Sequence, residues 1–222
     1  MRPETQTEFL IWNRQEKGVA VSKALDTAIY YLPGRGGQIS TGLGQGLIDR
    51  GFNVAGRETR GEFINRSFKA QVDQIATDLE SHFWRSCACV VANSYGAYLF
   101  LHAQAQLSPF PGRVLLLSPI VGDFRDANTN LGFIPPGARK IRELAMKGEM
   151  PVPRICEVHV GSEDWQSNPE NVRMLGKLLG VSVTIVQGSG HMLGKEYVGP
   201  LLDRWLPPAP ENADMTGTDH LE

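Results

Sequence analysis

Ser94 is flanked by small residues where the sequence pattern changes from strand to helix. Residues 87–92 form an apolar run typical of a buried strand, and residues 97–107 continue with helical character. Ala92 lies two residues before the serine and Gly96 two residues after it. A sharp strand-to-helix turn needs small neighbours, because bulk would collide with adjacent elements, and such a turn lifts the hydroxyl above the sheet. Ser94 is therefore a candidate nucleophile, although a serine that only caps the helix has the same appearance.

Acidic residues and a histidine follow two later strand-like runs. Glu163 and Asp164 come directly after the apolar run at 155–160, and His191 lies in a glycine-rich loop after the run at 181–186. A serine that attacks a carbonyl carbon requires a base, and that base requires an acid to orient it. The chain order of serine, acid and histidine, each just past the end of a predicted strand, therefore indicates nucleophilic catalysis.

At these positions the chain resembles the α/β-hydrolase family. The family places its nucleophile in a Gly-x-Ser-x-Gly turn, and its triad runs in the order serine, acid, histidine. Here Ala92 replaces the first glycine of that turn. The resemblance implies that Ser94 is the nucleophile, that His191 takes its proton, and that Asp164 holds the imidazole.

The choice of the acid also comes from the resemblance. The Gly-x-x-Asp spacing that the family shows after this strand selects Asp164 over Glu163. Asp123 is the alternative, because some members carry the acid after the preceding strand. A loop histidine that is only solvated or hydrogen-bonded is the plain alternative for His191.

The resemblance further implies an oxyanion hole made of two backbone amides. One amide would be that of Tyr95, directly after the serine, at the positive end of the following helix. The other would come from the loop after the predicted strand at 27–32. The family often has His-Gly and then the donor residue in this loop, and this sequence has Pro33-Gly34-Arg35. Arg35 is therefore the expected second donor.

Four large apolar side chains lie in segments that this fold would bring near the site: Phe124, Phe133, Trp165 and Met192. They could line a pocket for an acyl or alcohol group. Ordinary packing beneath a loop explains each of them equally well.

Three arginines and a glycine-rich stretch raise the question of whether the protein binds an anionic group or a nucleotide. Arg35, Arg57 and Arg60 follow the ends of neighbouring predicted strands and could attract an anionic group, though a solvated face accounts for them as well. The glycine-rich stretch at 34–46 contains no Gly-x-Gly-x-x-Gly directly after the strand and no Gly-Lys-Ser/Thr, and no acid closes the next strand. We therefore expect no nucleotide, no other organic cofactor and no metal.

The composition bounds the class of protein. The chain has 222 residues, of which 41% are hydrophobic and 21% charged, so it can bury a sizeable core. The net charge of −2 leaves no excess positive charge for a phosphate backbone, which argues against a nucleic-acid partner. Because the sequence has neither an apolar run of about 20 residues nor a signal-peptide pattern, we expect a cytoplasmic protein that does not enter a membrane. Three cysteines, an odd number in apolar runs without metal-ligand spacing, are expected to be buried, reduced thiols: Cys87, Cys89 and Cys156.

Apolar runs alternate with segments of helical period, which predicts a mostly parallel sheet with helices on both faces. Two runs that resemble an edge hairpin come first, at 8–12 and 19–24, and the other predicted strands are 27–32, 52–55, 87–92, 114–117, 155–160 and 181–186. Helices are predicted from 43 up to the glycine at 51, and at 67–83, 97–107, 138–147, 171–179 and 196–206. The long connection at 122–153 is typical of a lid or binding loop.

The resemblance implies the α/β-hydrolase fold in a single domain over residues 1–206, with a small insertion at 122–153. The polar, proline-rich tail at 207–222 is expected to be mobile. The implied reaction is hydrolysis of a small-molecule ester or thioester through an acyl-serine intermediate. Two alternatives stay open: an amidase or peptidase on the same scaffold, and a catalytically silent hydrolase fold that binds a small ligand or a partner protein.

Overall fold

The computed structural model describes residues 10–12, 25, 28–125 and 132–209. The predicted strand at 19–24 and most of the predicted mobile tail lie outside these residues.

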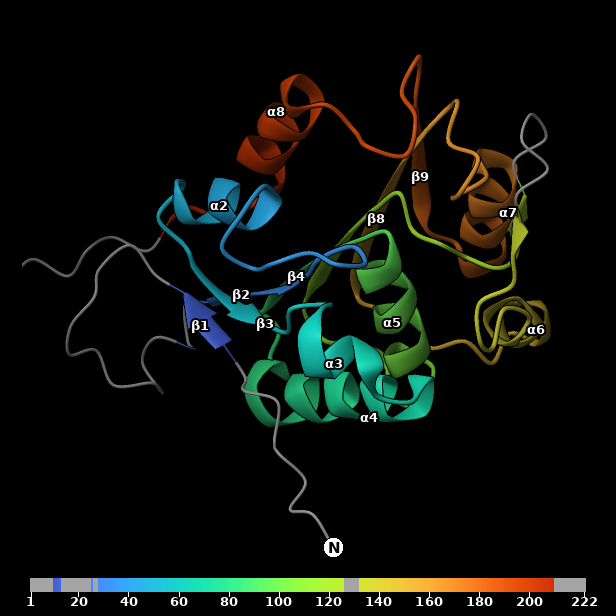
Figure 1. Cartoon of the computed structure of the whole chain (residues 1–222), viewed down its shortest axis with the longest axis horizontal. Coiled ribbons are helices and arrows are strands. Elements are labelled where there is room, and N and C mark those ends of the chain that lie inside the picture. Colours follow the sequence, from blue (N-terminus) through green and yellow to red (C-terminus); the bar gives the residue numbers. More distant parts are fainter. Residues whose placement is uncertain (1–9, 13–24, 26–27, 126–131, 210–222) are drawn as a thin grey trace, which may run out of the picture.

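A seven-stranded sheet forms the centre of the molecule (Figure 1). Its spatial order is β1-β3-β2-β4-β5-β8-β9. β1 pairs antiparallel with β3 at one edge, and the other neighbouring strands pair in parallel. The strands are β1 (Leu10–Trp12), β2 (Ala28–Leu32), β3 (Asn53–Gly56), β4 (Cys89–Asn93), β5 (Arg113–Leu117), β8 (Ile155–Gly161) and β9 (Ser182–Val186). The predicted mostly parallel sheet is therefore confirmed.

Helices cover both faces of this sheet (Figure 1). α2 (Leu43–Ile48) and α8 (Lys195–Trp205) pack on one face. The other face carries α4 (Phe68–Asp78), which continues as the π-helix η1 (Leu79–Phe83), together with α5 (Tyr95–Gln104), α6 (Lys140–Lys147) and α7 (Pro169–Leu179). The predicted amphipathic helix at 67–83 is confirmed by its four buried apolar positions, Val72, Ile75, Leu79 and Phe83.

The central strands β2, β4 and β5 are almost entirely buried because each face of the sheet meets a helical layer. In β2, Tyr30 and Leu32 point into the core beneath α4 and α5, whereas Ile29 and Tyr31 point into the core beneath α2 and α8. All five residues of this strand are buried. A half-exposed sheet would have shown alternation of apolar and polar residues instead.

Two elements were not expected from the sequence. The polar segment after β3 contains a short helix, α3 (Gly61–Asn65), whose Phe63 is buried. The connection at 122–153 holds the expected helix, α6, and also a two-stranded antiparallel hairpin of β6 (Phe124–Arg125) and β7 (Gly132–Phe133). Neither segment is long enough to develop a clear periodicity.

The cysteines need one correction. All three are free thiols, but Cys87 is exposed, because it lies in a turn between η1 and β4 and the chain enters the sheet only at Cys89. Burial raises the pKa of the Cys89 thiol to about 11 and that of the partly buried Cys156 to about 12. Both of these thiols are therefore protonated at neutral pH.

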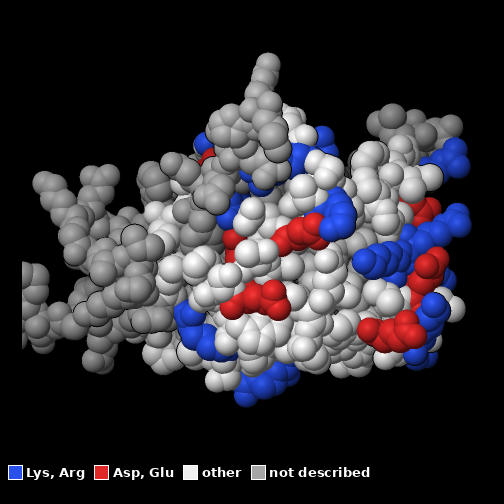
Figure 2. Space-filling model, turned by 90° about the horizontal axis from the view of Figure 1, so that it is seen from below, with Lys and Arg blue, Asp and Glu red and all other residues white. Residues whose placement is uncertain are grey.

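Charged side chains of both signs are interspersed on the face seen in Figure 2, without an extended patch of one sign. This agrees with the near balance of 22 basic and 24 acidic residues. Among the described residues, no helix has the length and apolar character needed to span a membrane.

Candidate active site

Parallel strands bring their carboxyl ends to one edge of the sheet, and the loops that follow them meet there. Ser94 follows β4, Asp164 follows β8 and His191 follows β9. The Ser94 hydroxyl donates to Nε2 of His191 at 2.7 Å. Nδ1 of His191 lies 2.9 and 3.0 Å from the two carboxylate oxygens of Asp164. The structure thus brings the three predicted side chains into one hydrogen-bonded row.

Ser94 has a backbone conformation that a non-glycine residue rarely adopts, with φ 53° and ψ −119°. Its amide donates to the Leu117 carbonyl at 2.9 Å, which ties the turn to β5. Two glycines give the turn its space. A Cβ on Gly96 would lie 2.2 Å from the Leu32 carbonyl oxygen, and one on Gly34 would lie 3.2 Å from the Ser94 Cβ. The turn therefore requires the small residues that the sequence places around it.

Asp164 is held by more than the histidine. Its Oδ1 accepts hydrogen bonds from the amides of Gln166 at 2.9 Å and Ser167 at 2.8 Å. Its side chain is fully buried, while the His191 ring is 14% exposed. These two amide donors hold the carboxylate in one orientation. Asp164 can therefore orient the ring through Nδ1 and leave Nε2 facing the serine.

The loop that carries His191 folds back over the end of β8. The Glu163 amide donates to the Ser189 carbonyl at 2.9 Å. A Cβ on Gly161 would lie 2.1 Å from that same carbonyl oxygen, so the approach depends on the glycine. Asp123 and Glu163, the other acids considered, are both exposed, and among the described residues the carboxylate that hydrogen-bonds to the His191 ring is that of Asp164.

The two expected oxyanion donors flank the serine. Tyr95 is the first residue of α5, and the first amides of a helix have no acceptor within the helix. Arg35 lies in the loop after β2, next to Gly34, where an added Cβ would lie 3.2 Å from the Ser94 Cβ. Within the described residues, the Arg35 amide makes no hydrogen bond. Both amides are therefore available to a ligand at the serine.

The three arginines have different surroundings. Arg57 is buried and makes a two-pronged ion pair with Asp78, with hydrogen bonds of 2.6 and 2.8 Å. Arg60 pairs with Glu58 at 2.6 Å. Arg35 is exposed, and its guanidinium carbon lies 5.9 Å from the centre of the Tyr95 ring. Arg57 is thus a structural residue and is not free to attract a ligand.

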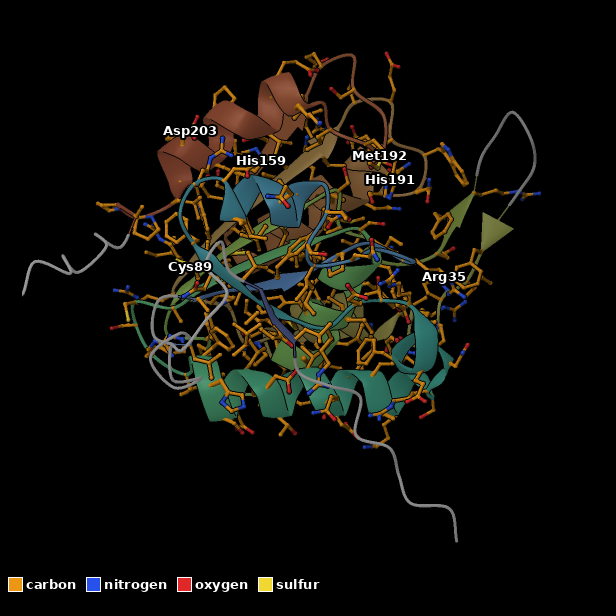
Figure 3. The ribbon with its side chains drawn as sticks, turned by 60° about the vertical axis from the view of Figure 1, so that its left-hand side comes forward. Arg35, Cys89, His159, His191, Met192 and Asp203 are labelled. Carbon is orange, nitrogen blue, oxygen red and sulfur yellow. The ribbon has the colours of Figure 1, made fainter. Side chains whose placement is uncertain are left out.

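Three of the four predicted pocket residues form a cluster in which Phe124 contacts both Phe133 and Trp165. The Phe124 ring centre lies 5.7 Å from that of Phe133 and 5.6 Å from that of Trp165, the residue after Asp164. Phe133 is 48% exposed and Met192 83% exposed. Figure 3 places Met192, His191 and Arg35 on one side of the molecule, with Cys89, at the start of β4, toward the other.

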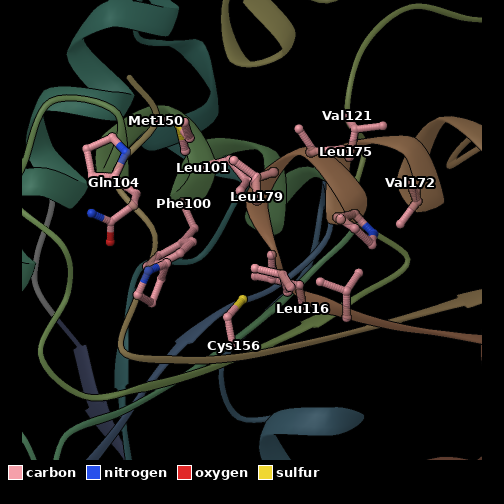
Figure 4. Close-up of a pocket in the computed structure, with 16 residues that line it drawn as sticks. Phe100, Leu101, Gln104, Leu116, Val121, Met150, Cys156, Val172, Leu175 and Leu179 are labelled. Atoms are coloured by element: carbon pink, nitrogen blue, oxygen red, sulfur yellow. The ribbon is translucent and has the colours of Figure 1, made fainter. Parts of the chain in front are cut away.

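Neither of the two cavities described is lined by the triad residues. A cavity of about 30 Å³ lies in the core between α5, α7 and the sheet, and its walls are almost entirely apolar (Figure 4). A groove of about 360 Å³ runs between α6 and α7, with Asp123 and Arg139 among its lining residues. The aromatic cluster, and not either cavity, therefore adjoins the reactive row.

Three buried hydroxyl residues support the site and were not singled out from the sequence. Ser167 donates to the Ser118 carbonyl at 2.6 Å, and its Oγ lies 3.4 Å from Nδ1 of His191. Ser118, directly after β5, has an unusual positive φ of 44°. Thr59 binds the loop that carries Arg35. An Asp-x-x-Ser pattern could have indicated Ser167, because an Asp side chain often accepts such amides locally.

No group of three or more metal-ligating side chains gathers anywhere in the described ranges. The row of hydroxyl, imidazole and carboxylate can move a proton away from the serine oxygen without further groups. This row lies at the carboxyl ends of the parallel strands, and its serine lies in a strained strand-to-helix turn. Both features are characteristic of the α/β-hydrolase fold.

Comparisons with solved structures agree with this fold. The chain resembles a monoacylglycerol lipase from Paleococcus ferrophilus, with a TM-score of 0.62 and 13% identity over 90% of this chain and 98% of that one. It also resembles a structure described among carboxylesterases of Nitrososphaera gargenis, with a TM-score of 0.57 and 14% identity over 89% of this chain and 93% of that one. Est1E from Butyrivibrio proteoclasticus, solved with ferulic acid bound, gives a TM-score of 0.59 and 12% identity over 89% and 92%.

No sequence-family model matches the chain, and no curated protein matches its sequence. The fold predicted from the sequence, an α/β hydrolase with a mostly parallel sheet, is confirmed by the sheet topology and by these structural neighbours.

Proposed function

We propose that this protein is a serine hydrolase that cleaves a small carboxylic ester or thioester through an acyl-serine intermediate. The observation that carries the proposal is the unbroken row from the Ser94 hydroxyl through the His191 ring to the Asp164 carboxylate. The structural neighbours described as a lipase and as carboxylesterases also support ester hydrolysis.

In the proposed acylation step, Ser94 Oγ forms a bond to the carbonyl carbon of the substrate while Nε2 of His191 takes the hydroxyl proton. Asp164 stabilises the resulting imidazolium through Nδ1. The tetrahedral intermediate then collapses, the bond to the leaving oxygen or sulfur breaks, and the leaving group takes the proton from Nε2. Ser94 is left as an acyl ester.

In deacylation, water attacks the acyl carbon and gives its proton to His191, and the carboxylic acid leaves as Ser94 regains its hydrogen. Each step places negative charge on the former carbonyl oxygen. The amides of Tyr95 and Arg35 would donate to that oxygen, which is the main electrostatic contribution in acyl transfer. Neither step uses a metal or an organic cofactor.

The aromatic cluster of Phe124, Phe133 and Trp165 is proposed to contact the acyl or alcohol group of the substrate. It adjoins Asp164 and is partly exposed, so an apolar group bound at Ser94 could cover it. The exposed Met192 could close over such a group from the histidine loop. A small insertion with one hairpin and one helix favours an open pocket over an enclosed chamber.

The test is a substrate panel run on purified wild type and Ser94→Ala. We expect wild type to hydrolyse p-nitrophenyl esters or acyl-CoA thioesters, and Ser94→Ala to lose that activity. Preferential cleavage of aminoacyl anilides would instead identify an amidase. If wild type and Ser94→Ala turn over every substrate equally, the proposal is wrong.

A further inference from the structure

Thr59 is a buried threonine outside the triad that contacts the loop carrying Arg35. It follows β3 by three residues, and none of its surface is exposed. Four hydrogen bonds join it to the loop. Its hydroxyl donates to the Gly34 carbonyl and accepts from the Gly37 amide at 3.2 Å, its carbonyl accepts from the Gly36 amide at 2.9 Å, and its amide donates to the Gly37 carbonyl at 3.2 Å.

The hydrogen bond from Thr59 to the Gly34 carbonyl also determines the direction of the Arg35 N–H. Gly34 and Arg35 share one peptide unit, which is planar and trans, so its C=O and N–H point in opposite directions. A hydroxyl that holds the Gly34 oxygen on one side therefore fixes the Arg35 N–H on the other. Gly34 packs against Ser94, so the reactive oxygen would develop close to this peptide unit.

Within the loop, the Gly34 carbonyl also accepts a hydrogen bond from the Gly37 amide at 2.9 Å, and that amide in turn donates to the Thr59 hydroxyl at 3.2 Å. Side chains in the loop add little further resistance to rotation of this peptide. Gly34, Gly36 and Gly37 have no side chain to restrict φ and ψ, and Gly36 adopts a φ of 80°. The segment that carries Thr59 is more rigid, because Arg57, two residues earlier, is held in the buried pair with Asp78 of α4. Thr59 thus connects a fixed strand end to a loop rich in glycine.

We propose that Thr59 is a positioning residue that aims the Arg35 amide at the oxyanion by holding the Gly34 carbonyl. This inference rests on the proposed function, since it assigns the orientation of one donor in that mechanism. The Thr59 hydroxyl touches no substrate atom and acts through the peptide unit. Its effect is expected in the transition state, where charge develops, and not in ground-state binding.

The experiment compares Thr59→Val, which has the same shape without the hydroxyl, with Thr59→Ser, which keeps it. We expect Thr59→Val to lower kcat on a p-nitrophenyl ester on the order of 10- to 100-fold with little change in KM, because removal of a whole oxyanion donor costs about 10²- to 10³-fold. Thr59→Ser should stay within about threefold of wild type by the same comparison. The matched control is Thr77→Val, which removes a hydroxyl that donates to a backbone carbonyl on the exposed face of α4.

A second measurement distinguishes a change in the orientation of the Arg35 amide from a general loss of structure around the site. A trifluoromethyl ketone adds to the serine as a hemiketal anion and so requires the oxyanion donors. Its inhibition constant should rise in Thr59→Val by the same factor by which kcat/KM falls, and the melting temperature shows whether the variant is folded. If Thr59→Val does not fold, Thr59→Ala takes its place in the comparison with Thr59→Ser.

Three results would overturn the inference: wild-type kcat in Thr59→Val, an equal loss in Thr59→Ser, or unchanged ketone affinity in a slow variant. Each leaves the serine mechanism intact if wild type still turns over and Ser94→Ala does not. If Ser94→Ala is as active as wild type, the proposed function fails and the inference fails with it.

Discussion

The reactive row depends on side chains that differ in how much each contributes. Ser94 supplies the bond to the substrate and His191 the proton transfer, whereas Asp164 orients a ring that is already placed by its loop. We expect Ser94→Ala and His191→Ala to lower kcat about 10⁴-fold or more, and Asp164→Asn to have a smaller effect. Steady-state kinetics on the best ester of the panel measure this order. Full activity in any one variant would remove that residue from the mechanism.

Substitution of Arg35 tests whether the oxyanion donor is its backbone amide or its guanidinium. Its amide is the proposed donor, and its guanidinium lies over the Tyr95 ring on the surface. Because Arg35→Ala keeps the amide, kcat/KM on a neutral ester should stay within about threefold of wild type, far less than the loss of a donor costs. Arg60→Ala is the matched control, since Arg60 is also exposed and pairs with Glu58 on the surface. A loss of tenfold or more in Arg35→Ala alone would mean that the guanidinium takes part.

Among the elements, the end of β3 is joined to α4 by a buried cluster. Asp78 accepts from Arg57 and from the Tyr30 hydroxyl, the latter at 2.9 Å. Burial and contact with Asp78 raise the pKa of Tyr30 well above its usual value, so this hydroxyl remains a donor at neutral pH. The cluster fixes the strand end from which Thr59 reaches the loop of Arg35.

Removal of one partner of this cluster should destabilise the protein. Asp78→Ala leaves the Arg57 charge buried without its carboxylate, and breaking a buried pair in this way costs about 3–5 kcal/mol. The free energy of unfolding from urea titration measures the loss. Glu58→Ala breaks the more exposed pair with Arg60 and should cost less than about 1 kcal/mol. Equal effects of the two substitutions would contradict this account of the cluster.

The insertion is attached to α5 through two side chains. The Tyr98 hydroxyl donates to the Pro136 carbonyl at 2.8 Å, and the His102 ring packs against Gly137, where a Cβ would lie only 2.8 Å from the ring. Burial, with a smaller effect of Lys140, lowers the pKa of His102 to about 4. The ring is therefore neutral in the folded protein at neutral pH.

This buried histidine should make stability depend on pH. In the unfolded chain its pKa is about 6.5, so between about pH 6.5 and 4 the unfolded state binds more protons than the folded state. Stability contributed by the neutral ring is present above this window and is lost as the pH falls through it. We expect His102→Gln to show a shallower loss of unfolding free energy than wild type over this range. The control His82→Gln changes an exposed ring, and an equal flattening there would argue against the assignment to His102.

At the scale of the whole molecule, most of the sheet could be predicted from the sequence. Strands that helices cover on both faces have continuous apolar sequences, which are easily recognised. The sequence also predicted that Ser94, Asp164 and His191 lie near one another, since each follows a strand whose carboxyl end faces the same edge. It did not predict the β6–β7 hairpin or α3, which are too short to develop a period. Thr59 was also missed, because its contacts are with residues more than twenty positions away.

The central claim is that Ser94 is a nucleophile activated by His191. Mass spectrometry of the folded protein after reaction with a fluorophosphonate tests it most directly, because only an activated serine attacks this phosphorus centre at a useful rate. We predict one adduct, located on the peptide that contains Ser94 and absent in both Ser94→Ala and His191→Ala. A folded wild type that forms no adduct, or that carries it on another residue, would contradict the account.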